Sequence, residues 1–166
     1  MTHVTLDENY DPYSDESYLT QIFAFPQVIG EGGFGVVYKA THKRNNKKFA
    51  IKKIKGDQAF DVTREIKNFE KVGCHPHIIK YIMGWQENME LYLLLELSQT
   101  SLADYVRNSV DVPALVYWDC IHDVCLALAY LNDIGIVHQD VKGRNILIHA
   151  KNFKLADFGC IIDLNE

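Results

Sequence analysis

The stretch H-Q-D-V-K-G-R-N at residues 138–145 is followed, twelve positions after its asparagine, by D-F-G at residues 157–159. Together these two stretches supply two carboxylates, an ammonium group and a carboxamide at short, fixed spacings. Transfer of a phosphoryl group from a magnesium nucleotide involves little covalent chemistry, but the γ-phosphate, its metal ions and an acceptor hydroxyl must be held in line. The four side chains are of the kinds that this task needs, so the two stretches indicate phosphoryl transfer.

The composition is that of an ordinary globular domain, because 48% of the 166 residues are apolar and 23% are charged. The net charge of −5 is unevenly distributed, since no lysine or arginine precedes Lys39. The acidic residues before it are Asp7, Glu8, Asp11, Asp15, Glu16 and Glu31. A front end of this charge repels nucleic acid, so we expect no nucleic-acid partner.

The sequence also bears on the compartment in which the protein works. No apolar run is long enough to cross a bilayer, and the chain opens with a polar, acidic segment instead of a secretory signal. The four cysteines form no C-x-x-C pair and are expected to be reduced thiols. We therefore expect an intracellular protein of the cytoplasm or nucleus, with no membrane segment in this chain and membrane association only through a region outside it.

The first half of the chain changes character near residue 23. Residues 1–22 form an acidic amino-terminal extension, expected to be disordered or to lie on the domain. Short β-rich runs follow, separated by a glycine-rich turn and a polar turn, and they predict an antiparallel meander. These runs are 23–29, 36–41 and 48–53. Pro26 lies within the first run and has no N–H to donate, so this strand should lie at a sheet edge.

The rest of the chain combines helices and strands. Apolar residues at helical spacing predict a helix over 62–72. A long helix is predicted from Pro113 to Gly135, because proline favours the first turn of a helix and glycine ends it. Four further strands are predicted at 78–84, 91–97, 145–148 and 153–156.

Two upstream features suit a nucleotide site. The stretch G-E-G-G-F-G at 30–35, with Val37 two positions later, has predicted strands on both sides, which suits a flap over phosphates. Its glycines would allow backbone N–H groups to approach phosphate oxygens, although a plain glycine hairpin gives the same pattern. Lys52 lies on the third predicted strand, and Glu65 follows on the predicted helix. Glu70 faces a different side of that helix, so Glu65 is the preferred partner for Lys52.

These motifs resemble those of eukaryotic protein kinases: the glycine loop, A-I-K, H-R-D-L-K-x-x-N and D-F-G. The resemblance implies an α+β, protein-kinase-like two-lobe fold with ATP and Mg2+ as cofactors. It divides the chain into the extension at 1–22, a complete β-rich amino-terminal lobe at 23–97 and only the first part of the helical carboxyl-terminal lobe at 98–166. One position departs from the motifs, because Gln139 stands where most kinases have arginine.

The resemblance also implies a role for each motif residue. Asp140 would orient the acceptor hydroxyl and accept its proton, and Lys142 would neutralise the γ-phosphate. Lys52, positioned by Glu65, would hold the α- and β-phosphates. The metal ligands would be Asn145 and Asp157. ATP would be contacted by Ile29, Gly30, Glu31, Gly32, Gly33, Phe34, Gly35, Val37, Ala50, Lys52, Leu95, Glu96, Leu97 and Leu147.

Four aromatic residues fall where kinases stack side chains through both lobes. They are Phe69, Tyr81, His138 and Phe158. The position of His138 in this set implies a buried structural histidine, although a histidine beside Asp140 could also be taken for a general base.

Several stretches resemble the Wee/Myt family, which inhibits cyclin-dependent kinases. The hinge of the Myt branch is similar to E-L-S-Q-T-S-L at 96–102. The segment that leads into the kinase domain of that branch is similar to S-Y-L-T-Q-I-F at 17–23. Its D-F-G segment is similar to K-L-A-D-F-G-C-I-I-D at 154–163. This family also lacks arginine at the position of Gln139. The resemblance implies a Ser/Thr-type or dual-specificity kinase whose protein partner is a cyclin-dependent kinase, acting on mitotic entry.

Two alternatives remain open at this point. The short loop after Lys52 and the Gly84-Trp85 pair resemble kinases of translation initiation factor two alpha, although those have arginine at the position of Gln139. The resemblance also stops shortly after D-F-G, which suits an inactive fragment or a pseudokinase, and the 166 residues alone are expected to be inactive. Retention of Lys52, Asp140 and Asp157 favours an enzyme, because pseudokinases commonly lose such residues.

Overall fold

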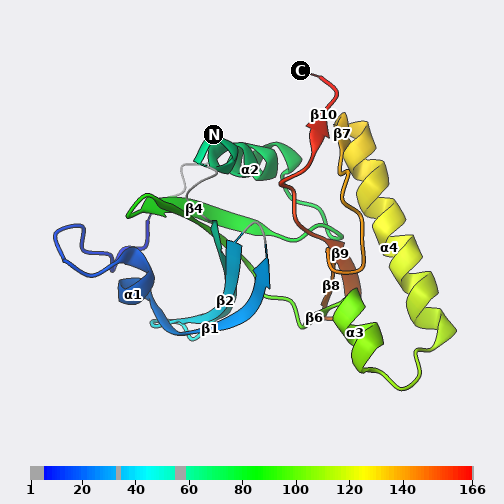
Figure 1. Cartoon of the computed structure of the whole chain (residues 1–166), viewed down its shortest axis with the longest axis horizontal. Coiled ribbons are helices and arrows are strands. Elements are labelled where there is room, and N and C mark those ends of the chain that lie inside the picture. The colour runs from blue at the N-terminus through cyan, green and yellow to red at the C-terminus, as the bar shows by residue number, and fades with distance from the viewer. Residues whose placement is uncertain (1–5, 33–34, 55–58, 166) are drawn as a thin grey trace. The chain divides into compact units, whose positions relative to one another are not determined.

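The computed structural model describes residues 6–32, 35–54 and 59–165, with the backbone alone over 59–65. It forms two compact units, one of Met1–Val62 with Ile82–Leu97 and the other of Thr63–Tyr81 with Ser98–Glu166. The two units are described in turn below. Figure 1 shows the elements of both.

The first unit is built on a five-stranded sheet with the strand order β1-β2-β3-β5-β4 (Figure 1). Its strands are β1 (Phe23–Gly32), β2 (Gly35–His42), β3 (Lys48–Ile54), β4 (Tyr81–Glu87) and β5 (Glu90–Glu96). The three neighbouring pairs β1–β2, β2–β3 and β3–β5 are antiparallel. The predicted meander is confirmed, and β5 is inserted beside β3.

Pro26 marks an irregularity in β1. The strand lies at the sheet edge, as predicted, and its pairing with β2 shifts register between Ala24 and Gln27. Phe25 adopts a φ of 52° at this point. Because proline cannot donate to the β-ladder, a bulge at an edge is where the fold can accept it.

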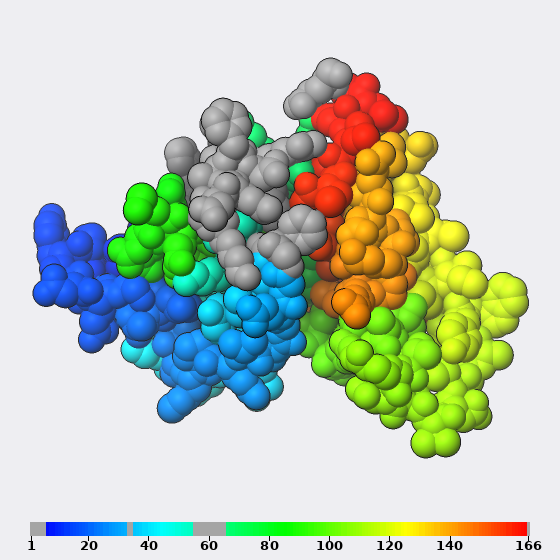
Figure 2. Space-filling model, in the orientation of Figure 1, coloured from blue at the N-terminus to red at the C-terminus, as the bar shows by residue number. Residues whose placement is uncertain are grey.

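The extension lies on the first unit from residue 6 onward. Ser17 caps the short helix α1 (Tyr18–Ile22) by accepting a hydrogen bond from the Thr20 N–H. Tyr18 lies 3% exposed, and its ring centroid is 5.0 Å from that of Trp85 and 5.0 Å from that of Tyr10. Its backbone N–H donates to Glu87 at 2.6 Å, and Figure 2 shows the blue extension beside the green β4–β5 turn. The extension was expected either to be disordered or to lie on the domain. From residue 6 onward it lies on the domain.

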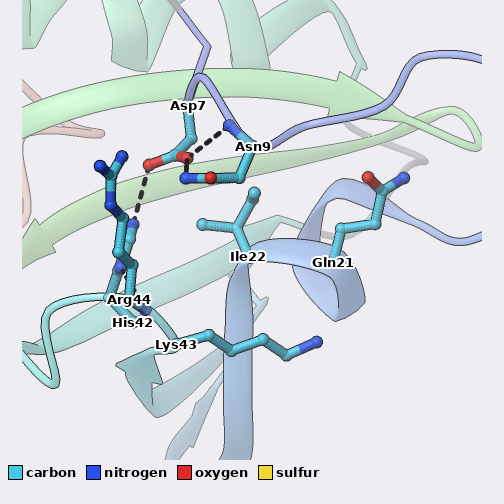
Figure 3. A pocket seen from close by; sticks show the side chains of 7 residues that line it. All are labelled: Asp7, Asn9, Gln21, Ile22, His42, Lys43 and Arg44. Atoms are coloured by element: carbon cyan, nitrogen blue, oxygen red, sulfur yellow. Dashed lines mark hydrogen bonds and ion pairs between the residues drawn. The ribbon is translucent and has the colours of Figure 1, made fainter.

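A cavity of about 280 Å³ lies between the extension and the β2–β3 turn (Figure 3). It is lined by Asp7, Asn9, Gln21, Ile22, His42, Lys43 and Arg44. Asp7 accepts a hydrogen bond from the Asn9 N–H at 2.9 Å and contacts His42 Nε2 at 2.9 Å. The backbone N–H of Asn9, and next the side chain of His42, lower the pKa of Asp7 to about 2. No residue of the predicted kinase motifs lines this cavity. The cavity lies where the extension is attached to the first unit.

The second unit carries helices α2 (Ala59–Val72), α3 (Leu102–Asn108) and α4 (Ala114–Asp133). A small sheet has the strand order β6-β8-β9, and a separate pair joins β7 to β10. These strands are β6 (Thr100–Ser101), β7 (Ile136–Val137), β8 (Ile146–His149), β9 (Asn152–Leu155) and β10 (Ile162–Asp163).

Helix α4 lies alongside β9 and β7 (Figure 1) and buries one face there. It begins after Pro113, which is its N-cap residue, and ends before Gly135, as the sequence predicts. Its buried side chains are Cys120, Asp123, Val124, Ala127 and Leu131. By length and composition α4 could also cross a membrane, a property that core helices of globular proteins share. Burial of Asp123, which accepts a hydrogen bond from the Phe153 N–H at 2.9 Å, supports the role of a core helix.

The attachment of the extension predicts a large effect on stability. Tyr18→Ala should lower the free energy of unfolding by about 3–5 kcal/mol, because it removes a buried ring from the aromatic cluster. Urea unfolding of the full-length protein, followed by tryptophan fluorescence, measures the change. Tyr13→Ala is the matched control, since Tyr13 is 95% exposed in the same extension. Equal midpoints for both variants would contradict the attachment.

Candidate active site

The glycine-rich turn joins β1 to β2 and is described up to Gly32 and from Gly35. Gly33 and Phe34, both predicted to contact ATP, lie outside the described residues. Gly35 has a φ of 142°, and a Cβ there would collide with the backbone carbonyl of Lys53, so the fold itself requires this glycine. A Cβ at Gly32 would meet nothing within 4 Å. The fold itself therefore does not require a glycine at position 32.

The strand register places the predicted ATP-contacting residues on one face of the sheet. Val37 on β2 lies opposite Lys52 on β3, and Ala50 lies opposite Leu95 on β5. Residues directly opposite one another share a face, as do residues two apart on one strand. Val37, Ala50, Lys52 and Leu95 therefore lie on the same face. Lys52 is 9% exposed there, and an ammonium group so deeply placed needs anionic partners.

The remaining predicted contacts of this site lie at element ends. Ile29 and Gly30 belong to β1, with Gly30 opposite Val37. Glu96 ends β5, and Leu97 follows it at the point where the first unit ends. Leu147 lies half-buried on β8 of the second unit. Glu65 lies on α2, but its side chain is outside the described part of the chain, so its pairing with Lys52 stays a prediction.

His138 is held by two backbone contacts in the interior of the second unit. Its Nε2 lies 3.1 Å from the Ala156 carbonyl oxygen, and its Nδ1 accepts from the Asp140 N–H at 3.3 Å. The ring is 2% exposed, and this burial lowers the pKa of His138 below its usual range. Since both ring nitrogens have backbone partners, His138 shapes the loop and is poorly placed to act as a general base.

The three polar residues of the catalytic loop meet one another. Lys142 Nζ donates to Asp140 Oδ2 at 2.6 Å, and Asn145 Nδ2 donates to the same oxygen at 2.9 Å. Asn145 Nδ2 also contacts the Asp140 carbonyl oxygen at 2.9 Å. The Lys142 hydrogen bond, followed by that of Asn145, lowers the pKa of the Asp140 carboxyl below its usual range. Asp140 is therefore ionised at neutral pH and able to accept a hydrogen bond from a substrate hydroxyl.

The D-F-G stretch is positioned by the ring of Phe158, which is fully buried. Its centroid lies 5.2 Å from that of Phe69 and 5.1 Å from that of His138. Phe69 in turn stacks on Tyr81 at 5.3 Å. The predicted stack of four rings is therefore confirmed.

The donor set fits a magnesium ion that is shared with a nucleotide. Asp157 offers a carboxylate beside the buried Phe158, and Asn145 uses its Nδ2 toward Asp140, which turns its carbonyl oxygen to the other side. The Ala156 N–H donates to the Asn145 carbonyl at 2.8 Å, so the two candidate ligands are fixed through adjoining backbone. Oxygen ligands from one or two side chains, completed by phosphates and water, are what Mg2+ prefers.

Comparison with known proteins agrees with this geometry. Residues 23–166 match the protein kinase domain. The membrane-associated tyrosine- and threonine-specific cdc2-inhibitory kinase wee-1.1 of Caenorhabditis elegans is 32% identical over 159 residues, which is 95% of this chain and 34% of the relative. Its Drosophila melanogaster counterpart is 30% identical over 157 residues, covering 90% of this chain and 30% of the relative. A serine/threonine-protein kinase of the same fly, CG17528, is 30% identical over 162 residues, with coverages of 90% and 21%.

The chain belongs to the protein kinase family. It spans about a third or less of the length of the curated relatives that it matches. Membership implies the use of ATP, normally with Mg2+, which agrees with the donor set described above.

Two contacts that hold this site were not predicted from the sequence. Asn68 on α2 donates through Nδ2 to the Phe158 carbonyl at 2.8 Å. Lys71 on α2 forms an ion pair with Asp163 on β10. The sequence offered one indication of the Asn68 contact. Asn68 directly precedes Phe69, so its polar side chain lies at the border of the buried face of the helix.

The contact between Lys142 and Asp140 predicts that Lys142 affects the pKa of the Asp140 carboxyl. Lys142→Met should raise the pKa of the Asp140 carboxyl, because the main group that favours the ionised form is removed. Carboxyl ¹³C chemical shifts, followed over pH in the full-length protein, measure the pKa. Lys151→Met, which changes an exposed lysine nearby in the sequence, is the control and should leave that pKa in place. A pKa unmoved by Lys142→Met would contradict the contact.

Proposed function

We propose that the protein transfers the γ-phosphate of ATP to a hydroxyl group of a protein substrate. The observation that carries the proposal is the cluster of Asp140, Lys142 and Asn145, in which a lysine and an amide both donate to one carboxylate oxygen. Its position next to the buried D-F-G phenylalanine supports a role for Asp157 in the same reaction. The protein kinase family of the chain supports the same reaction.

Each residue then has a definite task. Asp140 orients the acceptor hydroxyl and takes its proton as the phosphoryl group arrives. Lys142, which contacts Asp140 in the structure, neutralises charge on the transferred phosphoryl oxygens. Asn145 and Asp157 would hold Mg2+ through their side-chain oxygen atoms. When bound, MgATP supplies the phosphoryl group and the metal that screens its charge.

The first unit supplies the nucleotide contacts. Lys52 would contact the α- and β-phosphates, with Glu65 as its proposed positioning partner. The glycine-rich turn would offer backbone N–H groups to the phosphates, and the backbone of Glu96 and Leu97 would offer hydrogen bonds to the base. The apolar side chains of this unit proposed to contact the base are Ile29, Val37, Ala50 and Leu95, and Leu147 of the second unit is a further proposed contact.

Removal of the phosphate and metal contacts tests this function. Lys52→Met and Asp157→Ala should each lower kcat/KM on the order of a hundredfold or more, since each removes a charge contact made in the transition state. Peptide phosphorylation measures the change, in the complete protein with any residues that follow Glu166 in it, here called the full-length protein. Lys47→Met and Asp111→Ala are matched controls, because both residues are exposed and neither belongs to the proposed site. Near-normal transfer by either site variant would refute the assignment.

We further propose a Wee/Myt-type substrate. The acceptor would be the threonine or tyrosine in the glycine loop of a cyclin-dependent kinase, and phosphorylation there would inhibit that kinase and mitotic entry. Two of the relatives described above are cdc2-inhibitory kinases, and this supports the choice, as do the hinge, lead-in and D-F-G resemblances. Such a partner places the activity inside the cell, in the cytoplasm or nucleus. Lys142 favours a hydroxyl of serine or threonine, since tyrosine kinases usually have alanine or arginine there.

A side-by-side assay decides the substrate. The full-length protein is offered a cyclin-dependent kinase with a disabled active site and translation initiation factor two alpha at equal concentration. We expect preferential phosphorylation of the cyclin-dependent kinase, in its glycine loop, because three separate stretches favour that family. Phosphopeptide mass spectrometry locates the acceptor. Preference for the initiation factor would favour the alternative drawn from the short loop after Lys52 and the Gly84-Trp85 pair.

A further inference from the structure

Helix α2 contacts the D-F-G segment at two successive residues. Asn68 donates through Nδ2 to the carbonyl oxygen of Phe158 at 2.8 Å. Phe69, the next residue, packs edge-on against the ring of Phe158 at a centroid distance of 5.2 Å. Both the backbone and the side chain of Phe158 are therefore held by this helix.

A second contact lies one helical turn further along α2. Lys71 forms an ion pair with Asp163, whose side chain is 9% exposed, while that of Lys71 is 39% exposed. Asp163 belongs to β10 and lies opposite Ile136 of β7, the strand that leads into His138. Its other carboxylate oxygen accepts from the Asn165 N–H at 2.8 Å, which fixes the turn that follows.

The two contacts act on the same piece of chain. Asn68 and Lys71 are three residues apart, so they lie on one side of α2. Their partners, Phe158 and Asp163, lie at either end of the segment that follows Asp157. Burying a carboxylate as deeply as that of Asp163 costs free energy unless a cation is paired with it. Loss of Lys71 would therefore leave the buried charge of Asp163 without this cation and would destabilise the fold. A shift of α2 away from this segment has to break both contacts at once.

We propose that Asn68 and Lys71 are positioning residues that hold residues 158–163 against α2 and so fix the metal-binding carboxylate of Asp157. We call the two contacts, Asn68 with Phe158 and Lys71 with Asp163, the α2 anchor. The anchor also fixes the rotation of α2, the helix that carries Glu65. The proposal rests on the kinase function proposed above.

The charge in the anchor is built into the sequence. Asp163 supplies a permanent carboxylate, so the contact between α2 and the D-F-G segment needs no added phosphate. Residue 139, which precedes Asp140, is an uncharged glutamine and has no ion pair to offer to a phosphate. The anchor therefore holds the segment in the unmodified protein.

A double-mutant cycle tests the ion pair. Lys71→Met and Asp163→Asn, made singly and together in the full-length protein, are compared by peptide phosphorylation. Asparagine keeps an oxygen for the Asn165 N–H, so the second variant removes charge without removing that hydrogen bond. We expect each single variant to lower kcat between about two- and thirtyfold, with the KM for ATP changed less. The double variant should be no slower than the worse single variant, because both act through one contact.

A measurement independent of activity completes the test. Amide hydrogen exchange over 158–165 and the last turn of α2 should accelerate in Asn68→Leu, Lys71→Met and Asp163→Asn. Lys67→Met, an exposed lysine one turn earlier on the same helix, is the matched control and should change neither exchange nor kcat. The half-saturating Mg2+ concentration should rise in the three anchor variants, since Asp157 is less well placed.

The outcomes separate the anchor from the kinase function. Strictly additive losses in the cycle, or exchange no faster than in Lys67→Met, would overturn the anchor even in an active kinase. Conversely, a wild-type protein that transfers no phosphate would remove the proposed function, and exchange in the same variants would still show whether α2 is held by these residues.

Discussion

Burial of the Phe158 ring is the interaction on which the arrangement of the proposed catalytic residues depends. The ring is fully buried and contacts Phe69 on α2 and His138 before the catalytic loop. Removing such a ring from its place would open a cavity and expose the neighbouring aromatic rings, at a cost of several kcal/mol. The backbone of Asp157 is joined directly to this fixed residue. The packing of the Phe158 ring therefore determines the position of the Asp157 carboxylate, although this carboxylate takes no part in the packing.

The same packing also determines the state of the catalytic loop. His138 places Nε2 on the Ala156 carbonyl and accepts the Asp140 N–H at Nδ1, so the ring acts as a rigid bridge between the D-F-G strand and the loop. This bridge sets the backbone from which the Asp140 side chain projects. Lys142 and Asn145 both donate to one oxygen of that side chain, and these hydrogen bonds lower the pKa of the Asp140 carboxyl. The polar geometry of the loop thus depends on the apolar burial of Phe158 and His138.

The sequence predicted those parts of the fold that depend on neighbouring residues. Pro113 and Gly135 bounded α4 correctly, because helix ends are governed by local backbone preferences. The strand predicted over 78–84 was wrong at its start, since β4 begins at Tyr81. Ile79 instead donates to the Leu155 carbonyl, a partner far away in the sequence. The α2 anchor escaped prediction for the same reason: Lys71 and Asp163 reveal their pairing only when the chain is folded. For the candidate site, the Asp140 cluster could be anticipated as a motif, but its hydrogen bonds could not.

Alternation along β3 explains how one strand serves both stability and chemistry. Ile51 lies opposite Tyr38 and Leu94 and belongs to the aromatic cluster that the extension covers. Lys52, the next residue, points to the other face, with Val37 and Leu93 opposite. Because the side-chain period of a strand is two, a register slip of one residue would exchange the two faces and bury Lys52 against Trp85 and Tyr18. By packing Tyr18 on one face, the extension makes that slip costly. An amino-terminal segment with no catalytic motif of its own therefore helps to keep Lys52 on the face that carries the other proposed nucleotide contacts.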